Sequence, residues 1–343
     1  MPRHFYTGDF MNSSLFEIGQ KSDMDMLEFL IQQKEPQNLI ETTYHFTALM
    51  IATIYNNRHS VLYLLEKSAD VNTRNVFQLS ALDYACENGY HEIAALLIRY
   101  GAQINERDGL NWTPLLHACL TGNVKTVELL LKKNADIHTV DSLSGYYPLL
   151  CACEKKDLKT VQILIQAGAD PNGIMGASET PLCLTAKNGD EEILNFLCES
   201  GADINLATKY GETALMQSVY YGNIKIARNL LARKADTNAS DASGWTALMH
   251  ACCGNADSIV PLLIEHGADI KKKNRNGWTA FFFAAGFGSS KSTFENLLKH
   301  GAKMEERDYN HHSPYHISIK YQNNVFREWA ETRIPDKKEF QPF

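Results

Sequence analysis

The stretch GWTALMHACC occupies residues 244–253, and GWTAFFFAAG follows at residues 277–286, 33 residues later. GETALMQSVY stands 33 residues earlier, at residues 211–220. The Thr-Ala-Leu element, or a close variant of it, begins at Thr47, Ser80, Thr113, Tyr147, Thr180, Thr213, Thr246, Thr279 and Ser313, at intervals of 33 or 34 residues. A second mark, Gly-Ala-Asp and its variants, keeps the same spacing from Ser68 to Gly301. Two marks in register indicate an array of stacked repeats, which overrides the two or three globular domains that 343 residues would otherwise suggest.

Each repeat has the signals of two short helices and a turn. The threonine can cap a first helix, in whose first turn proline is tolerated, and glycine ends that helix, as at Gly122. A polar residue such as Asn123 then begins a second helix with an apolar stripe, as in VKTVELLLKKNAD at residues 124–136. The Gly-Ala-Asp segment predicts a hairpin-like finger that leads back to the next repeat.

This helix–turn–helix–finger pattern resembles the ankyrin repeat over roughly residues 13–329. The histidine that usually follows Thr-Pro-Leu is mostly replaced, and only His316 keeps it. The replacements affect the side-chain hydrogen bond that this histidine usually makes to the finger, and they do not affect the expected fold. The resemblance implies an all-α, ankyrin-repeat solenoid with an N-terminal capping helix pair, about eight full repeats and a C-terminal cap.

We expect a flexible arm at residues 1–12, the N-terminal capping pair at 13–44, repeats at 45–309, a C-terminal capping repeat at 310–330 and a tail at 331–343. One extra residue within HTVDSLSGYYP, residues 138–148, should lengthen one finger. Another, near Ser290, should lie between two helices. Pro261 falls near the start of a second helix, where it costs little.

Composition favours a soluble folded protein, with 44% hydrophobic and 21% charged residues. The net charge of −7 argues against nucleic acid as the main partner. No stretch approaches the length of a membrane span, and the N-terminal residues lack the apolar core of a signal peptide. We therefore expect no membrane insertion and a cytoplasmic protein, with a nuclear location as an open alternative.

The cysteines and histidines follow the repeat rather than a reactive site. Cys86, Cys119, Cys153 and Cys252 share one column with alanines, which predicts buried packing residues in a reduced protein. His117 and His250 share another column four repeats apart, too far to hold one metal, and we interpret them as half-buried helix residues. No catalytic motif or zinc spacing occurs, so we expect no catalytic residues, no metal, no cofactor and no enzymatic activity.

Candidate binding residues come from columns that the resemblance places on the concave face, on the fingers and at the ends of first helices. These columns are expected to face solvent, yet they are rich in the aromatic residues that dominate interfaces. The predicted partner-binding residues are Tyr44, Phe46, Tyr55, Phe77, Leu110, Trp112, Tyr146, Tyr210, Tyr220, Tyr221, Trp245, Trp278 and Phe287. Packing of Trp112, Trp245 and Trp278 between neighbouring fingers is an equally open interpretation.

Glu179, Lys187 and Asn188 make a polar gap in repeat five, which divides the aromatic residues into a zone in repeats one to four and another in repeats six to eight. The hypothesis is a non-catalytic scaffold, monomeric by itself, that binds an extended protein or peptide segment along this aromatic groove. Two alternatives stay open: a substrate-recruiting adaptor of a larger complex, for example in ubiquitin transfer, and a microbial effector that acts on host proteins.

Overall fold

The computed structural model describes residues 14–174, 179–254 and 256–333. Regular structure there consists of α-helices and short 3-10 turns, with one isolated bridge between Ile40 and Thr47 and no strand in the described ranges. The chain divides into two compact units, with α1–α10 in the first and α11–α20 in the second. The predicted N-terminal arm lies outside the described residues, as does the predicted tail from residue 334 onward.

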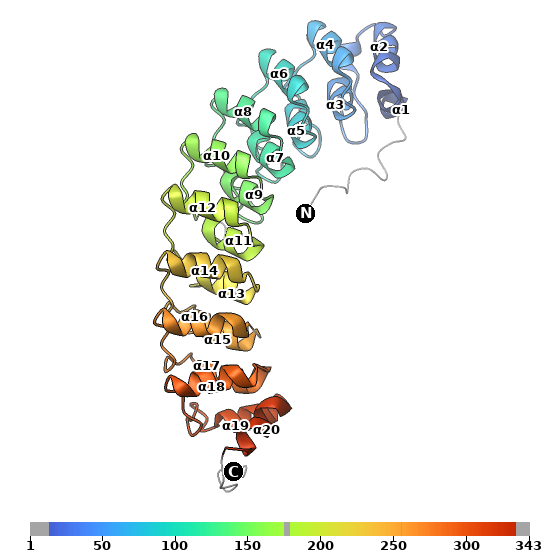
Figure 1. Cartoon of the computed structure of the whole chain (residues 1–343). Helices are drawn as coiled ribbons and strands as arrows, with labels where there is room; N and C mark the ends of the chain where they lie inside the picture. Colours follow the sequence, from blue (N-terminus) through green and yellow to red (C-terminus); the bar gives the residue numbers. More distant parts are fainter. Residues whose placement is uncertain (1–13, 175–178, 255, 334–343) are drawn as a thin grey trace. The chain divides into compact units, whose positions relative to one another are not determined.

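Each unit is a stack of helix pairs. In the first unit, the first helices of successive pairs pack against one another, as do the second helices (Figure 1). Its helices are α1 (Ser14–Lys21), α2 (Asp23–Ile31), α3 (Ala48–Ile54), α4 (Arg58–Glu66), α5 (Ala81–Glu87), α6 (His91–Arg99), α7 (Pro114–Thr121), α8 (Val124–Lys132), α9 (Pro148–Glu154) and α10 (Leu158–Gln166), with a 3-10 turn η2 (Pro36–Asn38).

The second unit repeats this arrangement of two helix layers. Its helices are α11 (Pro181–Asn188), α12 (Glu191–Glu199), α13 (Ala214–Tyr220), α14 (Ile224–Ala232), α15 (Ala247–Cys253), α16 (Val260–Glu265), α17 (Ala280–Phe287), α18 (Lys291–Lys299), α19 (Pro314–Lys320) and α20 (Asn324–Glu331), with a 3-10 turn η3 (Asp257–Ile259). The sequence pattern is confirmed as an all-helical repeat fold.

Helix ends form where the sequence predicts them. The Thr113 hydroxyl accepts a hydrogen bond from the backbone N–H of Leu116, and Gly122 ends α7 in the left-handed region at φ 68°. Asn123 then caps α8, and its Nδ2 also donates to the Gly89 carbonyl at 2.8 Å. One side chain therefore begins its own second helix and holds the first helix of the preceding repeat.

Neighbouring fingers are joined by backbone hydrogen bonds. The N–H of Ala242 donates to the Tyr210 carbonyl at 2.8 Å, and Gly109 donates to Phe77 in the same way at 3.2 Å. Within a finger, the side chain of the first residue accepts hydrogen bonds from the backbone N–H groups of later residues. Asp241 Oδ1 accepts from both Ser243 and Trp245 at 2.8 Å. The bonds between fingers fix neighbouring fingers relative to one another.

The predicted irregularities lie where expected. Asp141 N–H donates to the carbonyl of Tyr146, five residues on, whereas Asp241 N–H donates to that of Trp245, four residues on, so the first finger is one residue longer. Ser289 is the added residue between α17 and α18, and its hydroxyl donates to the Cys252 carbonyl. Pro261 stands in the first turn of α16, where its missing N–H removes no helix bond.

The prediction that the shared cysteine column is buried is also confirmed. All eight cysteines are free thiols, and the four in the shared column are fully buried. Burial raises the pKa of the Cys86 thiol well above its usual value. The column is a packing feature, because a thiol is small enough for close helix approach.

Candidate protein-binding groove

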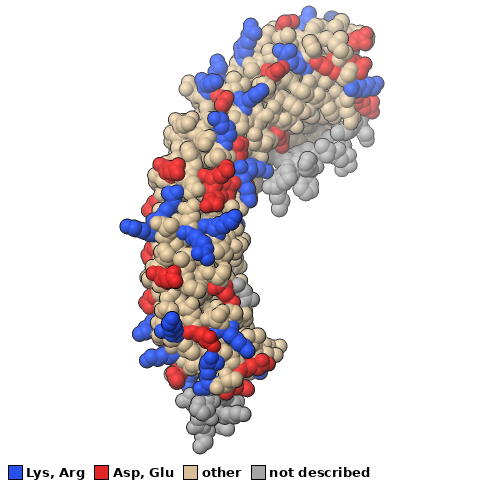
Figure 2. Space-filling view, viewed as in Figure 1, with Lys and Arg blue, Asp and Glu red and all other residues tan. Residues whose placement is uncertain are grey.

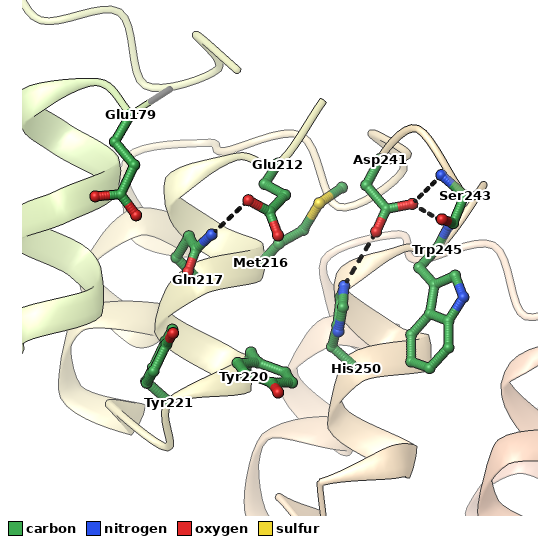
Figure 3. A pocket seen from close by; sticks show the side chains of 10 residues that line it. All are labelled: Glu179, Glu212, Met216, Gln217, Tyr220, Tyr221, Asp241, Ser243, Trp245 and His250. Carbon is green, nitrogen blue, oxygen red and sulfur yellow. Dashed lines mark hydrogen bonds and ion pairs between the residues drawn. The ribbon is translucent and has the colours of Figure 1, made fainter. Parts of the chain in front are cut away.

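A groove opens in the second unit among the repeats that contain α11, α13 and α15. Its volume is about 420 Å³, and Figure 3 shows its lining side chains. They are Glu179, Glu212, Met216, Gln217, Tyr220, Tyr221, Asp241, Ser243, Trp245 and His250. The carboxylates of finger residues form one side, and side chains of α13 and α15 form the other, together with Tyr221 and the Trp245 ring, which packs on His250 (Figure 3).

The finger side of the groove is acidic. Glu179 lies 3.1 Å from the Lys187 ammonium, and Glu212 accepts a hydrogen bond from Gln217 Nε2 at 2.9 Å. Burial alone would raise the pKa of Asp241. Its interaction with the His250 ring and the two backbone N–H groups of its own finger lower that pKa overall. Asp241 is therefore ionised at neutral pH.

The helix side of the groove is aromatic. Tyr220 ends α13 and Tyr221 follows as its C-cap, and the two rings meet edge to face with centroids 5.1 Å apart. The Trp245 ring lies against His250 at 5.0 Å, and the Tyr220 ring approaches His250 at 5.7 Å. The groove thus places aromatic rings opposite carboxylates.

His250 is the buried polar group of this wall. The residue is 9% exposed, and its Nε2 lies 3.6 Å from Asp241 Oδ2, too far for a well-formed hydrogen bond. Its Nδ1 has no hydrogen-bond partner among the described residues. The sequence predicts a half-buried helix residue here, and the structure shows one that is nearly enclosed but lines the groove.

The first unit contains the same three residue types at the same spacing. Asp108, Trp112 and His117 correspond to Asp241, Trp245 and His250. His117 is 1% exposed, and its Nε2 lies 3.2 Å from Asp108 Oδ2. In repeat three this set is closed and paired internally, whereas in repeat seven it borders an open groove. The groups of His, Cys, Asp and Glu in the described chain form no cluster that could hold a metal ion.

The structure places the thirteen predicted binding residues in three different environments. Tyr210, Tyr220 and Tyr221 are exposed, at 53%, 60% and 49%. A second set is half-buried: Tyr44, Tyr55, Phe77, Leu110, Trp112, Tyr146, Trp245 and Phe287. Phe46 and Trp278 are buried, and only Tyr220, Tyr221 and Trp245 line the groove.

The expectation that these columns face solvent is wrong at Phe46 and Trp278. Phe46 is 4% exposed because it packs edge to face on Phe16 of the first helix pair, with centroids 5.1 Å apart. Trp278 is 9% exposed because its ring packs on Phe283, while its Nε1 donates to Asp308 of the next finger at 3.0 Å. For Trp278 the packing interpretation describes what the structure shows.

Sequence reasoning misses much of the groove. It gives Glu179 only as part of a polar gap, and it assigns the carboxylates of Glu212 and Asp241 to no site. Lys187 pairs with Glu179 and lies over the Tyr221 ring at 5.6 Å, so polar residues of repeat five border the groove. The sequence feature that could have pointed to Asp241 is the spacing of Asp, Trp and His that repeats three and seven share.

Comparison with known proteins agrees with the repeat architecture. The family model described as ankyrin repeats (3 copies) matches residues 15–108, 82–175, 149–241, 182–274, 234–308 and 259–329. The fold is similar to the crystal structure of the human ASB11 ankyrin repeat domain, with a TM-score of 0.58 and 24% identity over 66% of this chain and 99% of that one. No curated protein matches the chain.

The chain belongs to the ankyrin repeat family. Members of this family are interaction modules that bind protein partners and are generally not catalytic. None of the helices in the described ranges combines the length and the apolar character that crossing a membrane requires.

Proposed function

We propose that the protein is a scaffold that binds an extended segment of a partner protein along the second unit, centred on the groove. The exposed pair Tyr220 and Tyr221 carries this proposal, because two large rings that remain half exposed beside a concavity offer area for a partner to bury. Tyr210 extends the same aromatic character onto the finger.

A protein suits this surface better than nucleic acid. The whole chain has a net charge of −7, and three carboxylates line the groove, so a phosphate backbone would be repelled (Figure 2 shows the charged side chains on one face). We expect no cofactor in the groove and a monomeric protein by itself.

We also propose a contact zone in the first unit. Tyr44 and Phe77 stand on neighbouring fingers with nearly parallel rings whose centroids are 6.0 Å apart. Such a half-buried stack offers apolar area that a partner side chain can cover.

The adaptor and effector hypotheses share this binding step and differ in its consequence. An adaptor would hold a second component while the groove is occupied, so the two would be recovered together. A cytoplasmic location, with a nuclear one as the alternative, is part of the same proposal.

The test is capture of binding partners from lysate by the intact protein and by matched variants. The double variant Tyr220→Ala/Tyr221→Ala should lose bound proteins that the intact protein retains, without a lower melting temperature. Tyr100→Ala is the control, because this exposed tyrosine comes directly after α6, in the layer of second helices. Equal capture by the double variant and the intact protein would refute a binding role for this groove.

A further inference from the structure

The groove has more negative than positive charge. Its ten lining residues include the carboxylates of Glu179, Glu212 and Asp241 and no lysine or arginine. Lys187, at the rim, pairs with Glu179 at 3.1 Å. Glu212 and Asp241 face polar partners instead, namely an amide and a histidine ring.

Both of these carboxylates keep capacity for further hydrogen bonds. A carboxylate has about four acceptor sites. The Glu212 carboxylate accepts one side-chain hydrogen bond, from Gln217. Asp241 Oδ1 accepts from the two backbone N–H groups of its finger, and Asp241 Oδ2 lies 3.6 Å from His250 Nε2. Because they belong to successive fingers, they present separate acceptors along the groove.

The opposite wall suits a flat cation. The rings of Tyr220 and Trp245 line the same cavity as the carboxylates (Figure 3). A guanidinium group is planar, stacks on aromatic faces, is weakly hydrated and has five donors in a fixed fork. A lysine ammonium is compact and strongly hydrated, so it uses a ring face and two separated acceptors less well.

His250 gives an independent indication that the wall is incomplete. It is a buried polar side chain that lines the groove, and its Nδ1 lacks a partner within the described chain. Leaving a buried polar atom unpaired is costly, and a bound polar group can supply the missing bond directly or through water. Its counterpart His117 differs, since it lies within hydrogen-bond distance of Asp108.

We propose that this groove binds the guanidinium group of an arginine side chain from the partner's extended segment, between Glu212 and Asp241 on one side and Tyr220 and Trp245 on the other. The inference rests on the proposed function and adds the chemistry of the residue that the partner inserts.

The experiment uses three short peptides, acetyl-Gly-Arg-Gly-amide and its lysine and citrulline counterparts, titrated into the full-length protein and monitored by calorimetry and by the indole N–H resonances. Citrulline keeps the shape of arginine and removes the charge. The arginine peptide should bind in a salt-dependent manner and shift the Trp245 resonance, which Trp245→Phe would identify. The lysine peptide should bind several-fold more weakly, and citrulline should not bind measurably.

Two protein variants test the carboxylates. Asp241→Asn keeps the finger intact, because Asn75 and Asn274 accept the same backbone N–H bonds in other repeats. Glu212→Gln keeps an acceptor for Gln217. Each variant should weaken binding of the arginine peptide by about tenfold or more, since each removes a charge-assisted hydrogen bond. Glu265→Gln, an exposed position at the end of α16, removes the same charge and should leave binding unchanged.

Equal binding of arginine and citrulline, equal binding of arginine and lysine, an unshifted Trp245 resonance or no binding of the arginine peptide would each overturn the guanidinium assignment. These outcomes are distinct from failure of the proposed function. If Tyr220→Ala/Tyr221→Ala abolishes partner capture while Glu212→Gln and Asp241→Asn leave it intact, the groove binds a partner but not through an arginine. If the tyrosine pair has no effect on capture, the proposed function itself fails.

Discussion

Asp108 in the first unit should make repeat three sensitive to acid. Burial alone would raise its pKa, but the hydrogen bond and charge of His117, with backbone N–H donors from Trp112 and Leu110, lower it from 3.8 to about 2. At about 1.4 kcal/mol for each pKa unit, this difference corresponds to about 2 kcal/mol of unfolding free energy. A lowered carboxyl pKa stabilises the folded state above pH 3.8, and the stabilisation is lost as pH falls towards 2.

The perturbation is Asp108→Asn, which keeps the finger bonds, as Asn75 does in repeat two. At pH 6 the variant should be less stable by about 2 kcal/mol, and the difference from the intact protein should nearly vanish at about pH 2. Urea unfolding monitored by circular dichroism measures the unfolding free energy of the variant and of the intact protein at each pH. Because repeat arrays unfold in parts, hydrogen exchange of the α7 amides should show where stability is lost.

Asp241→Asn is the matched control for this prediction, because Asp241 meets its histidine at 3.6 Å rather than 3.2 Å and is less enclosed. Its effect on stability should be clearly smaller. Unfolding free energies of Asp108→Asn and the intact protein that stay equal from about pH 6 to about pH 2 would refute the coupling of Asp108 to His117.

Three further predictions concern packing and capping. Asn123→Ala should lower the unfolding free energy by about 1–2 kcal/mol, since one side chain both caps α8 and bonds to the preceding repeat; a chemical denaturation curve unchanged from that of the intact protein would contradict this. Trp278→Phe should cost about 1–3 kcal/mol because the buried Asp308 carboxylate loses a donor, and a melting temperature equal to that of the intact protein would show that the bond is dispensable. The native protein should react with a thiol reagent at half-buried Cys253 well before Cys86, as peptide mass spectrometry of labelled protein can measure, and equal rates would contradict the packing assignment.

The sequence by itself determined the repeat, its helices and most of its packing. Thr113, Gly122 and Asn123 act through bonds to residues at most four positions away in the chain, or one position from the equivalent place in the neighbouring repeat. Such interactions recur at a fixed interval, so a period of 33 residues is enough to reveal them. The cysteine column is predictable for the same reason, because only small side chains recur where helices approach closely.

Only the tertiary structure decided which members of a column are exposed and which of them share a cavity. Phe46 and Trp245 occupy equivalent positions, yet Phe46 is buried under Phe16 of the capping pair while Trp245 borders a groove. Likewise, His117 and His250 have the same local spacing to an aspartate and a tryptophan, yet His117 is 1% exposed and paired with Asp108, whereas His250 is 9% exposed and lines a groove. A repeat pattern specifies position within one unit, whereas exposure depends on side chains of adjacent repeats that vary independently of the period.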